Sequence, residues 1–298
     1  MAAYRLGTVM LHKQPTPVAL VDGQVFTLAE IFGFARLGNP PASITDLLDD
    51  WRANRDKLAI AAEAAREADQ GREPDSLIYL SPISRPSKVI CIGVNYRDHL
   101  AEMNVKSLPE YPYAFLRPHT SLAGHKEEIQ LPKMPHLVDW EAELGIVIGR
   151  RVRGIELSEA LDAIAGYTII NDISARDWIA SRPAVGIDWV MQKAWDRFQP
   201  TGPWLTPAEF VPEPQRLAIE LAVNGIVKQQ SNTSLMIFGV REIVHHLASI
   251  MTLEPGDIIA TGTPAGVGYG RNPPETIRPG DRVVVKIEGL GVLENRFH

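Results

Sequence analysis

The chain of 298 residues contains a single cysteine, Cys91, so no disulfide can form within it. A reducing compartment is compatible with this composition. Cys91 lies in the apolar run 88–94, which has the pattern of a buried strand. We therefore predict a core thiol at Cys91 and not a nucleophile.

Long hydrophobic runs and an excess of positive charge are also missing. No stretch of about 18 apolar residues occurs, so we expect no membrane-spanning helix. The net charge is −6 and no basic stripe is present, so we expect no nucleic-acid partner. The first residues lack the basic start and apolar run of a signal peptide, and we expect a cytoplasmic protein.

The sequence does have the composition of a globular protein, with 45% hydrophobic and 22% charged residues. We predict a small α+β N-terminal domain over residues 1–80, with two short strands and a helix that Ser43 caps. A proline-rich connector then leads into a β-rich α+β domain over 81–298. Its expected strands are 88–94, 112–116, 144–149, 165–171, 217–223, 257–261 and 281–287, and its expected helices are 98–103, 158–163 and 239–251.

Carboxylates open one of these apolar runs. The run begins Asp139-Trp140-Glu141-Ala142-Glu143 and continues to Gly149. Side chains alternate along a strand, so Glu141 and Glu143 share a face with Asp139, and the two glutamates lie about 7 Å apart along the strand. Unpaired carboxylates at the mouth of a buried strand are unfavourable, and a cation would relieve this. Oxygen ligands favour Mg²⁺, Mn²⁺ or Ca²⁺ over zinc. A solvated strand end with surface acids fits the spacing equally well.

Three further positions could carry chemistry. Asp172 ends the apolar run 166–171, where it either lines a site or caps a helix. His99 and Glu102 are three residues apart, so one helical turn places them together as a general base with its orienting carboxylate, or as an ordinary exposed pair. Lys193 lies among aromatic residues, where it either neutralises an anionic substrate or extends along the surface.

Two other patterns are less informative. The glycine-rich segment 260–270 contains Thr263 and exposes backbone N–H groups suited to a carboxylate, although a tight loop explains it as well. It is no dinucleotide fingerprint, because no helix follows it. His245 and His246 are adjacent on an expected helix and diverge by about 100°, so we reject them as a chelating pair.

Five segments in the same order resemble the fumarylacetoacetate hydrolase family. Together they span about residues 85–298. The matching segments are Val89–His99, Asp139–Gly149, Ile170–Asp177, Lys193–Trp204 and Leu253–Gly268.

The resemblance implies a mixed β-sandwich roll, a homodimer, and Mg²⁺ or Mn²⁺ as the cofactor. It leaves Asp139 outside the ligand set, as a supporting or surface acid. Residues are assigned to roles as follows: metal ligands Glu141, Glu143 and Asp172; a water-activating pair, His99 and Glu102, on a short helix; Lys193 as a further catalytic residue; and substrate contacts from Tyr96, Arg176 and Thr263.

The implied activity is metal-dependent hydrolysis of the C–C bond of an acylpyruvate, a 2,4-dioxo acid, to pyruvate and a carboxylic acid. The alternative is an oxaloacetate decarboxylase, or an isomerase or decarboxylase of 2-hydroxyhepta-2,4-diene-1,7-dioate type. A silent family member that only binds a metabolite is a third reading, against which the intact site residues argue. Two departures bear on the site: one concerns the far end of the substrate, and the other implies three protein carboxylates on the metal, with water and substrate completing the octahedron. Ile179 stands where acylpyruvate-cleaving members often have Gln, and Asn95 where some members have a metal-binding Asp.

Overall fold

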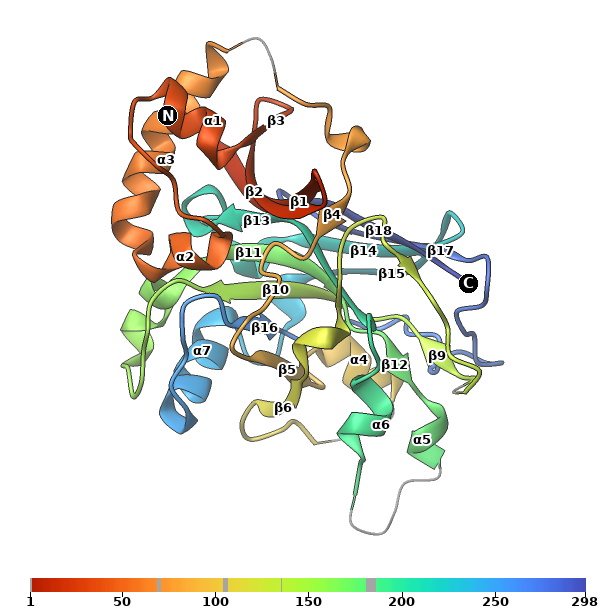
Figure 1. Cartoon of the computed structure of the whole chain (residues 1–298). Helices are drawn as coiled ribbons and strands as arrows, with labels where there is room; N and C mark the ends of the chain where they lie inside the picture. The colour runs from red at the N-terminus through yellow and green to blue at the C-terminus, as the bar shows by residue number, and fades with distance from the viewer. Residues whose placement is uncertain (1, 69–70, 104–106, 135, 181–185) are drawn as a thin grey trace.

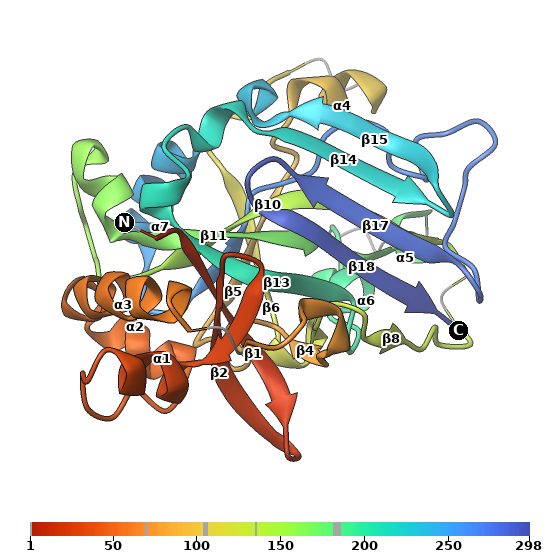
Figure 2. The same cartoon turned by 90° about the horizontal axis from the view of Figure 1, so that it is seen from above.

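The computed structural model describes residues 2–68, 71–103, 107–134, 136–180 and 186–298. It is a sheet-rich α+β protein in which two large sheets lie face to face (Figures 1 and 2). The mixed β-sandwich roll expected from the sequence is confirmed. Among the helices of the described residues, none is both long and apolar enough to cross a membrane.

The larger sheet contains eleven strands and curls upon itself. Its main path runs β3-β2-β1-β13-β11-β10-β16-β5-β6, and β4 pairs with β1. The short β7, which follows β6, pairs with β13 and so brings the two sides of the sheet together. The strand bounds are β1 (Tyr4–Leu11), β2 (Gln14–Val21), β3 (Gln24–Thr27), β4 (Tyr79–Leu80), β5 (Val89–Gly93), β6 (Tyr113–Arg117), β7 (Leu122–Ala123), β10 (Ala142–Ile148), β11 (Ile164–Asn171), β13 (Gln199–Pro207) and β16 (Ile258–Ala260).

The second sheet has five strands in the order β15-β14-β17-β18-β8 and covers one face of the first (Figure 2). A large apolar cluster that includes Ile146, Leu221 and Val285 fills the space between the sheets. A separate pair of short strands, β9 and β12, lies near the end of β11. The bounds are β8 (Glu128–Ile129), β9 (Val138–Asp139), β12 (Ser174–Ala175), β14 (Ala218–Val223), β15 (Ile226–Asn232), β17 (Arg282–Ile287) and β18 (Gly291–Phe297).

Helices cover the rest of the larger sheet. The N-terminal helices lie over β1–β3, and a second apolar cluster, which includes Leu47, Leu58 and Val147, joins them to the sheet. The α-helices are α1 (Leu28–Phe34), α2 (Ile44–Asp49), α3 (Trp51–Arg66), α4 (Arg97–Glu102), α5 (Asp177–Ala180), α6 (Trp189–Lys193) and α7 (Val240–Ile250). The 3-10 helices are Pro74–Ser76, His119–Ser121, Leu157–Ala163, Ala208–Phe210, Pro214–Arg216 and Thr233–Leu235.

Local sequence signals explain several of these boundaries. Ser43 caps α2 as predicted, because its hydroxyl accepts the N–H of Asp46 at 3.1 Å. Thr27 and Glu30 form a capping box at α1. The expected helix 158–163 is instead a 3-10 helix over Leu157–Ala163.

The predicted division at residue 80 stays a prediction. Strand β1 pairs with β13 through Leu6 and Leu205, so the first 80 residues supply edge strands to the large sheet. The second apolar cluster also takes residues from both sides of that position.

One strand prediction is wrong in its extent. Residues 139–149 do not form a single strand, because β9 ends at Asp139 and β10 begins at Ala142. At the break, the N–H of Glu141 donates to the side chain of Asn171 at 3.1 Å and not to a ladder partner. Asp139 and Glu141 therefore do not share the face of one continuous strand.

Candidate metal centre

Three buried carboxylates meet where β10 begins and β11 ends. One oxygen from each of Glu141, Glu143 and Asp172 lies within 4.8 Å of the others. The antiparallel pairing of β10 and β11 explains why residues 30 positions apart meet, since Ala142 lies opposite Asn171. The N–H of Asp172 then donates to the carbonyl of Glu141 at 2.8 Å. The structure thus brings the three predicted ligands together.

Two of the three carboxylates have cationic partners. The Lys193 ammonium lies 2.7 Å from Glu141 Oε2 and 2.5 Å from Asp172 Oδ2. Arg176 pairs with Glu141, and Arg117 lies 2.5 Å from Asp172 Oδ1. Burial opposes ionisation of Glu141, but Lys193 and Arg176 outweigh it and hold the pKa of this carboxyl far below its usual range. Lys193 is buried, so the alternative of a surface side chain is wrong.

Glu143 is the exception. Among the described residues no lysine or arginine forms an ion pair with it, and its Oε2 accepts the N–H of Gly262 at 2.8 Å. Burial and the charges of Asp172 and Glu141 raise the pKa of Glu143 well above its usual range. A buried acid in this position fits a divalent cation, which would supply the missing positive charge. The donor set contains only oxygen, which suits a hard ion.

The alternative of a solvated strand end is therefore wrong. All three carboxylates are buried, and so is Asp139, which is 1% exposed. Asp139 is not a surface acid: its Oδ2 lies 3.0 Å from Nε of Arg176, which also pairs with Glu141. Asp139 is therefore linked to Glu141 through Arg176 and is not one of the three clustered carboxylates.

Buried His99 pairs with the partly buried carboxylate of Glu102 on α4. His99 Nδ1 lies 3.1 Å from Glu102 Oε2. A carboxylate only accepts, so Nδ1 carries the proton and Nε2 is the ring nitrogen left for substrate or water. Burial opposes the charge on Glu102, but His99 and the N–H of Gly266 lower the pKa of this carboxyl. The alternative of an ordinary exposed pair is wrong, because His99 is only 6% exposed.

The glycine-rich segment connects the histidine pair to the carboxylates. Gly262 donates to Glu143, and the N–H of Gly266 donates to Glu102 Oε1 at 3.0 Å. Gly266 has a φ of +100°, and a Cβ there would lie 2.2 Å from the carbonyl oxygen of Lys228. Only glycine fits this position without displacing the neighbouring backbone. The segment therefore fixes the spacing between the two groups.

The three predicted substrate contacts lie around this centre. Thr263 accepts a hydrogen bond from Gln229 Nε2 at 2.8 Å. Tyr96 is buried beside α4, and within the described part of the chain its hydroxyl has no hydrogen-bond partner. The Arg176 guanidinium is held between two carboxylates. Direct contact of these residues with a substrate stays a prediction.

Sequence reasoning missed Arg117 and Gln229. Arg117 follows exposed Leu116 at the end of an ordinary strand, and only the curl of the sheet carries its guanidinium to Asp172. Asn95, which stands where some members have a metal-binding Asp, has a structural contact instead. Its side-chain amide donates to the backbone carbonyls of Phe238 and Thr261 and so holds these two segments together. Cys91 is fully buried, which confirms a core thiol, and burial with the charge of Asp172 raises the pKa of this thiol.

The predicted departure at Ile179 is not tested. The side chain of Ile179 and residues 181–185 lie outside the part of the chain that the structure describes.

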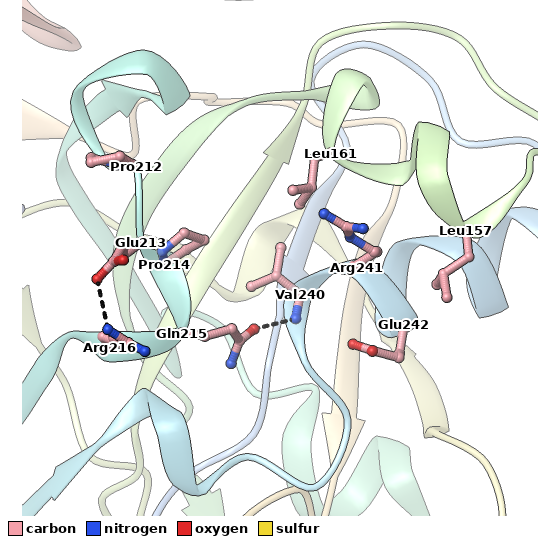
Figure 3. A pocket seen from close by; sticks show the side chains of 10 residues that line it. All are labelled: Leu157, Leu161, Pro212, Glu213, Pro214, Gln215, Arg216, Val240, Arg241 and Glu242. Atoms are coloured by element: carbon pink, nitrogen blue, oxygen red, sulfur yellow. Dashed lines mark hydrogen bonds and ion pairs between the residues drawn. The ribbon is translucent and has the colours of Figure 1, made fainter.

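A different cavity of about 460 Å³ lies beside α7 (Figure 3). Two of its charged residues pair with each other, Arg216 with Glu213 at 3.5 Å, and the neutral side chain of Gln215 accepts the N–H of Val240 at 2.5 Å. None of the carboxylate or histidine groups described above lines it. We assign it no role in the chemistry of the centre.

Comparison with known proteins shows what the chain is similar to. The family model described as "Fumarylacetoacetate (FAA) hydrolase C-terminal" matches residues 88–298. The chain is 43% identical over 218 residues to the bovine (Bos taurus) protein named oxaloacetate tautomerase FAHD2A, mitochondrial, with 73% of this chain and 68% of that protein aligned.

Two solved structures are similar over nearly the whole chain. One is a 2-hydroxyhepta-2,4-diene-1,7-dioate isomerase from Mycobacterium marinum, at 32% identity and a TM-score of 0.73, covering 99% of this chain and 98% of that one. The other is a maleylpyruvate hydrolase from Sphingobium sp. SYK-6 in complex with manganese(II) and pyruvate, at 28% identity and a TM-score of 0.78, covering 98% of each.

These proteins are named as enzymes of different reactions, so they establish the kind of protein and not its substrate. The family model covers more than two thirds of the chain, and it includes all the carboxylate and histidine residues of the centre. The chain therefore belongs to the fumarylacetoacetate hydrolase family.

Proposed function

We propose that the centre hydrolyses the C–C bond of acylpyruvates, giving pyruvate and a carboxylic acid. The observation that carries the proposal is the pairing of buried His99 with the partly buried Glu102 beside the carboxylates. His99 is close enough to Glu141 for its charge to lower the pKa of that carboxyl. A histidine oriented by a carboxylate is suited to take a proton from water.

We also propose Mg²⁺ or Mn²⁺ as the ion held by Glu141, Glu143 and Asp172. When bound, the ion supplies Lewis-acid polarisation of the 2-oxo and carboxylate oxygens of the substrate. The neighbour that contains manganese(II) and pyruvate supports this choice, because pyruvate is one of the proposed products.

The side chains of the chain supply the proton transfers. His99 Nε2 accepts a proton from water, and Glu102 stabilises the imidazolium through Nδ1. The hydroxide adds to the distal carbonyl carbon, and the bond between that carbon and C3 then breaks. The electron pair passes to C3 as the pyruvate enolate, which takes the proton back from His99. Lys193 adds positive charge where the negative charge develops.

A second candidate is proton transfer on oxaloacetate without addition of water. The specific observation in its favour is the name of the bovine relative, an oxaloacetate tautomerase. Tautomerisation or isomerisation needs only that a base remove a proton beside the 2-oxo group and return it elsewhere. Decarboxylation of oxaloacetate would pass through the same kind of enolate. His99 could serve in each of these reactions.

One experiment separates the candidates. Purified protein is stripped of metal, reloaded with Mg²⁺ or Mn²⁺, and incubated with acylpyruvates, oxaloacetate and an unsaturated oxo-diacid. Ultraviolet absorbance, released pyruvate and released CO₂ are followed. Loss of acylpyruvate with formation of pyruvate supports hydrolysis, whereas a change only in the keto–enol ratio of oxaloacetate supports the tautomerase. If no substrate is turned over with either ion, both candidates fail.

Glu141→Ala tests the metal assignment in the same assay. The variant should lose metal-dependent activity while its circular dichroism spectrum is unchanged. Activity retained in that variant would refute the assignment of Glu141 as a ligand.

We further propose that the protein is a homodimer and acts in the cytoplasm, as the resemblance and the sequence led us to expect. Size-exclusion chromatography with light scattering and localisation of a tagged chain would test these two expectations.

A further inference from the structure

Three aromatic side chains form a connected group beside the carboxylates, which we call the aromatic shelf: Tyr113 and Phe115 of β6, and Trp189 of α6. The Phe115 and Trp189 rings are stacked, with centroids 4.2 Å apart and an interplanar angle of 9°. The indole N–H of Trp189 donates to the Tyr113 hydroxyl at 2.9 Å. The stacked faces of Phe115 and Trp189 therefore cover each other, and most of the exposed ring surface of the shelf comes from Trp189 and Tyr113. The indole N–H is satisfied by the Tyr113 oxygen.

The shelf touches the charged centre through Lys193. Trp189 and Lys193 are four residues apart on α6, so they lie on one side of that helix. The Lys193 ammonium, which pairs with Glu141 and Asp172, lies 5.8 Å from the centroid of Phe115. Figure 1 shows α6 beside β6, and their residues are in contact. The inner end of the shelf is thus next to the carboxylates.

The register of the sheet places the shelf on the face that carries Glu143. Glu143 and Gly145 are two residues apart on β10 and share a face. Gly145 pairs with Ala260 of β16. Ala260 pairs in turn with Cys91 of β5, and Cys91 with Phe115. Directly paired residues point to the same side of a sheet, so Phe115 is on the side of Glu143.

The outer end of the shelf opens to solvent. Tyr113 lies opposite Gly93, where a Cβ would be 3.1 Å from the Tyr113 ring, so the ring lies against bare backbone. Exposure rises from 9% at Phe115 to 45% at Tyr113. The group therefore leads from the buried centre to the surface.

We propose that the aromatic shelf holds the acyl tail of the substrate, and that the tail is apolar or aromatic. The inference deepens the proposed function and rests on it. A 2-oxo acid headgroup at the carboxylates directs its far end outward, and the shelf offers uncharged ring faces in that region. Aromatic faces bind apolar or planar groups, with a gain beyond the burial of area when rings stack. The preferred substrates are then acylpyruvates with a large apolar or aryl tail.

Equilibrium binding tests the proposal without turnover. Calorimetry measures the affinity of the Mn²⁺-loaded protein for pyruvate, which has no tail, and for phenylpyruvate, which has an aryl tail. The wild type should bind phenylpyruvate about tenfold more tightly or better. In Trp189→Ala the difference should fall to about twofold, with the affinity for pyruvate unchanged. Trp189→Phe, which keeps a ring, should retain most of the preference. It keeps the proposal testable if the alanine variant does not fold.

Two matched controls truncate exposed neighbours that face away from the shelf. Leu116→Ala changes the opposite side of β6, and Val190→Ala changes α6 next to Trp189; these side chains are 57% and 71% exposed. Both variants should keep the wild-type preference. Thermal unfolding of each variant confirms the fold.

The outcomes distinguish the two proposals. If the wild type binds pyruvate but shows no preference for phenylpyruvate, or if Trp189→Ala keeps the preference, the shelf proposal is wrong and the proposed function stands. If Trp189→Ala changes the oligomeric state and not the preference, a second copy of the chain covers the shelf and the proposal is also wrong. If no 2-oxo acid binds the metal-loaded protein, the proposed function itself fails.

Discussion

Replacing Glu143 with glutamine should have opposite effects in the absence and presence of metal. Glu143 is the buried carboxylate that lacks a cationic partner among the described residues, and its neighbours Glu141 and Asp172 carry like charge. The amide of Glu143→Gln has nearly the same shape, and its oxygen can still accept the N–H of Gly262. The substitution therefore removes charge repulsion together with one of the three proposed metal ligands.

The size of the effect follows from the geometry. At a separation of 4.8 Å and an effective dielectric constant of about 20, two like charges repel by roughly 3 kcal/mol. Lys193 offsets part of this repulsion, and protonation of Glu143 limits the rest. We expect metal-free Glu143→Gln to be more stable than the wild type by about 1–3 kcal/mol. Conversely, an ion at 100 times its dissociation constant should stabilise the wild type by about 2.7 kcal/mol and the variant by far less.

Thermal unfolding with chelator and with Mn²⁺ measures both effects. A change of 1 kcal/mol corresponds to about 2–4 °C in a domain approaching this size. Glu128→Gln, at an exposed site on β8, is the control and should follow the wild type in both conditions. If Glu143→Gln is several degrees less stable than the wild type in chelator, or keeps the full stabilisation by Mn²⁺, the electrostatic reasoning is wrong.

Three further predictions concern the surroundings of the centre. His99→Gln should lower turnover by about 10²–10⁴-fold, because the general base is lost, while stabilisation by Mn²⁺ is unchanged. Arg117→Met should destabilise the protein by about 3–5 kcal/mol in chemical denaturation, because it removes a buried partner of Asp172. The third prediction is a loss of stability in acid. Burial lowers the pKa of His125 to about 4, and its Nδ1 accepts the N–H of Glu294 at 3.0 Å. Between about pH 6.5 and pH 4 the unfolded state binds the proton and the folded state does not. The free energy of unfolding should therefore decrease as the pH is lowered through this window, by at most about 3 kcal/mol.

Each of these predictions has its own control. A loss of the Mn²⁺ effect in His99→Gln would contradict the separation of the base from the metal ligands. Arg117→Lys should recover part of the stability that Arg117→Met loses, and equal losses in both variants would argue against a role for the charge. His125→Asn should flatten the dependence of stability on pH in that window, and an unchanged slope would exclude His125 as its source.

The strands that carry the carboxylates could be predicted because they are buried on both faces. The runs of β10 and β11 are mostly apolar, and such a pattern depends only on local sequence. Strand β13 was not among the predicted strands, since Pro200, Pro203 and Pro207 argue against a strand in the middle of a sheet. It pairs with β1 and with β11 nonetheless, and Pro207 itself lies opposite Gly166 of β11.

The sequence by itself identified the carboxylates, the histidine pair and the family, because these rest on residue types at fixed spacing. It left open whether Glu141 and Glu143 were solvated or buried, and it treated Asp139 as a supporting or surface acid. Only the tertiary structure decided these points. Burial depends on what covers a strand end, and here Arg176, Lys193 and the loop at Gly262 come from distant segments. The unequal sharing of cations, which leaves Glu143 without one among the described residues, arises from the curl of the sheet and the pairing of its strands, and neither can be read from spacing along the chain.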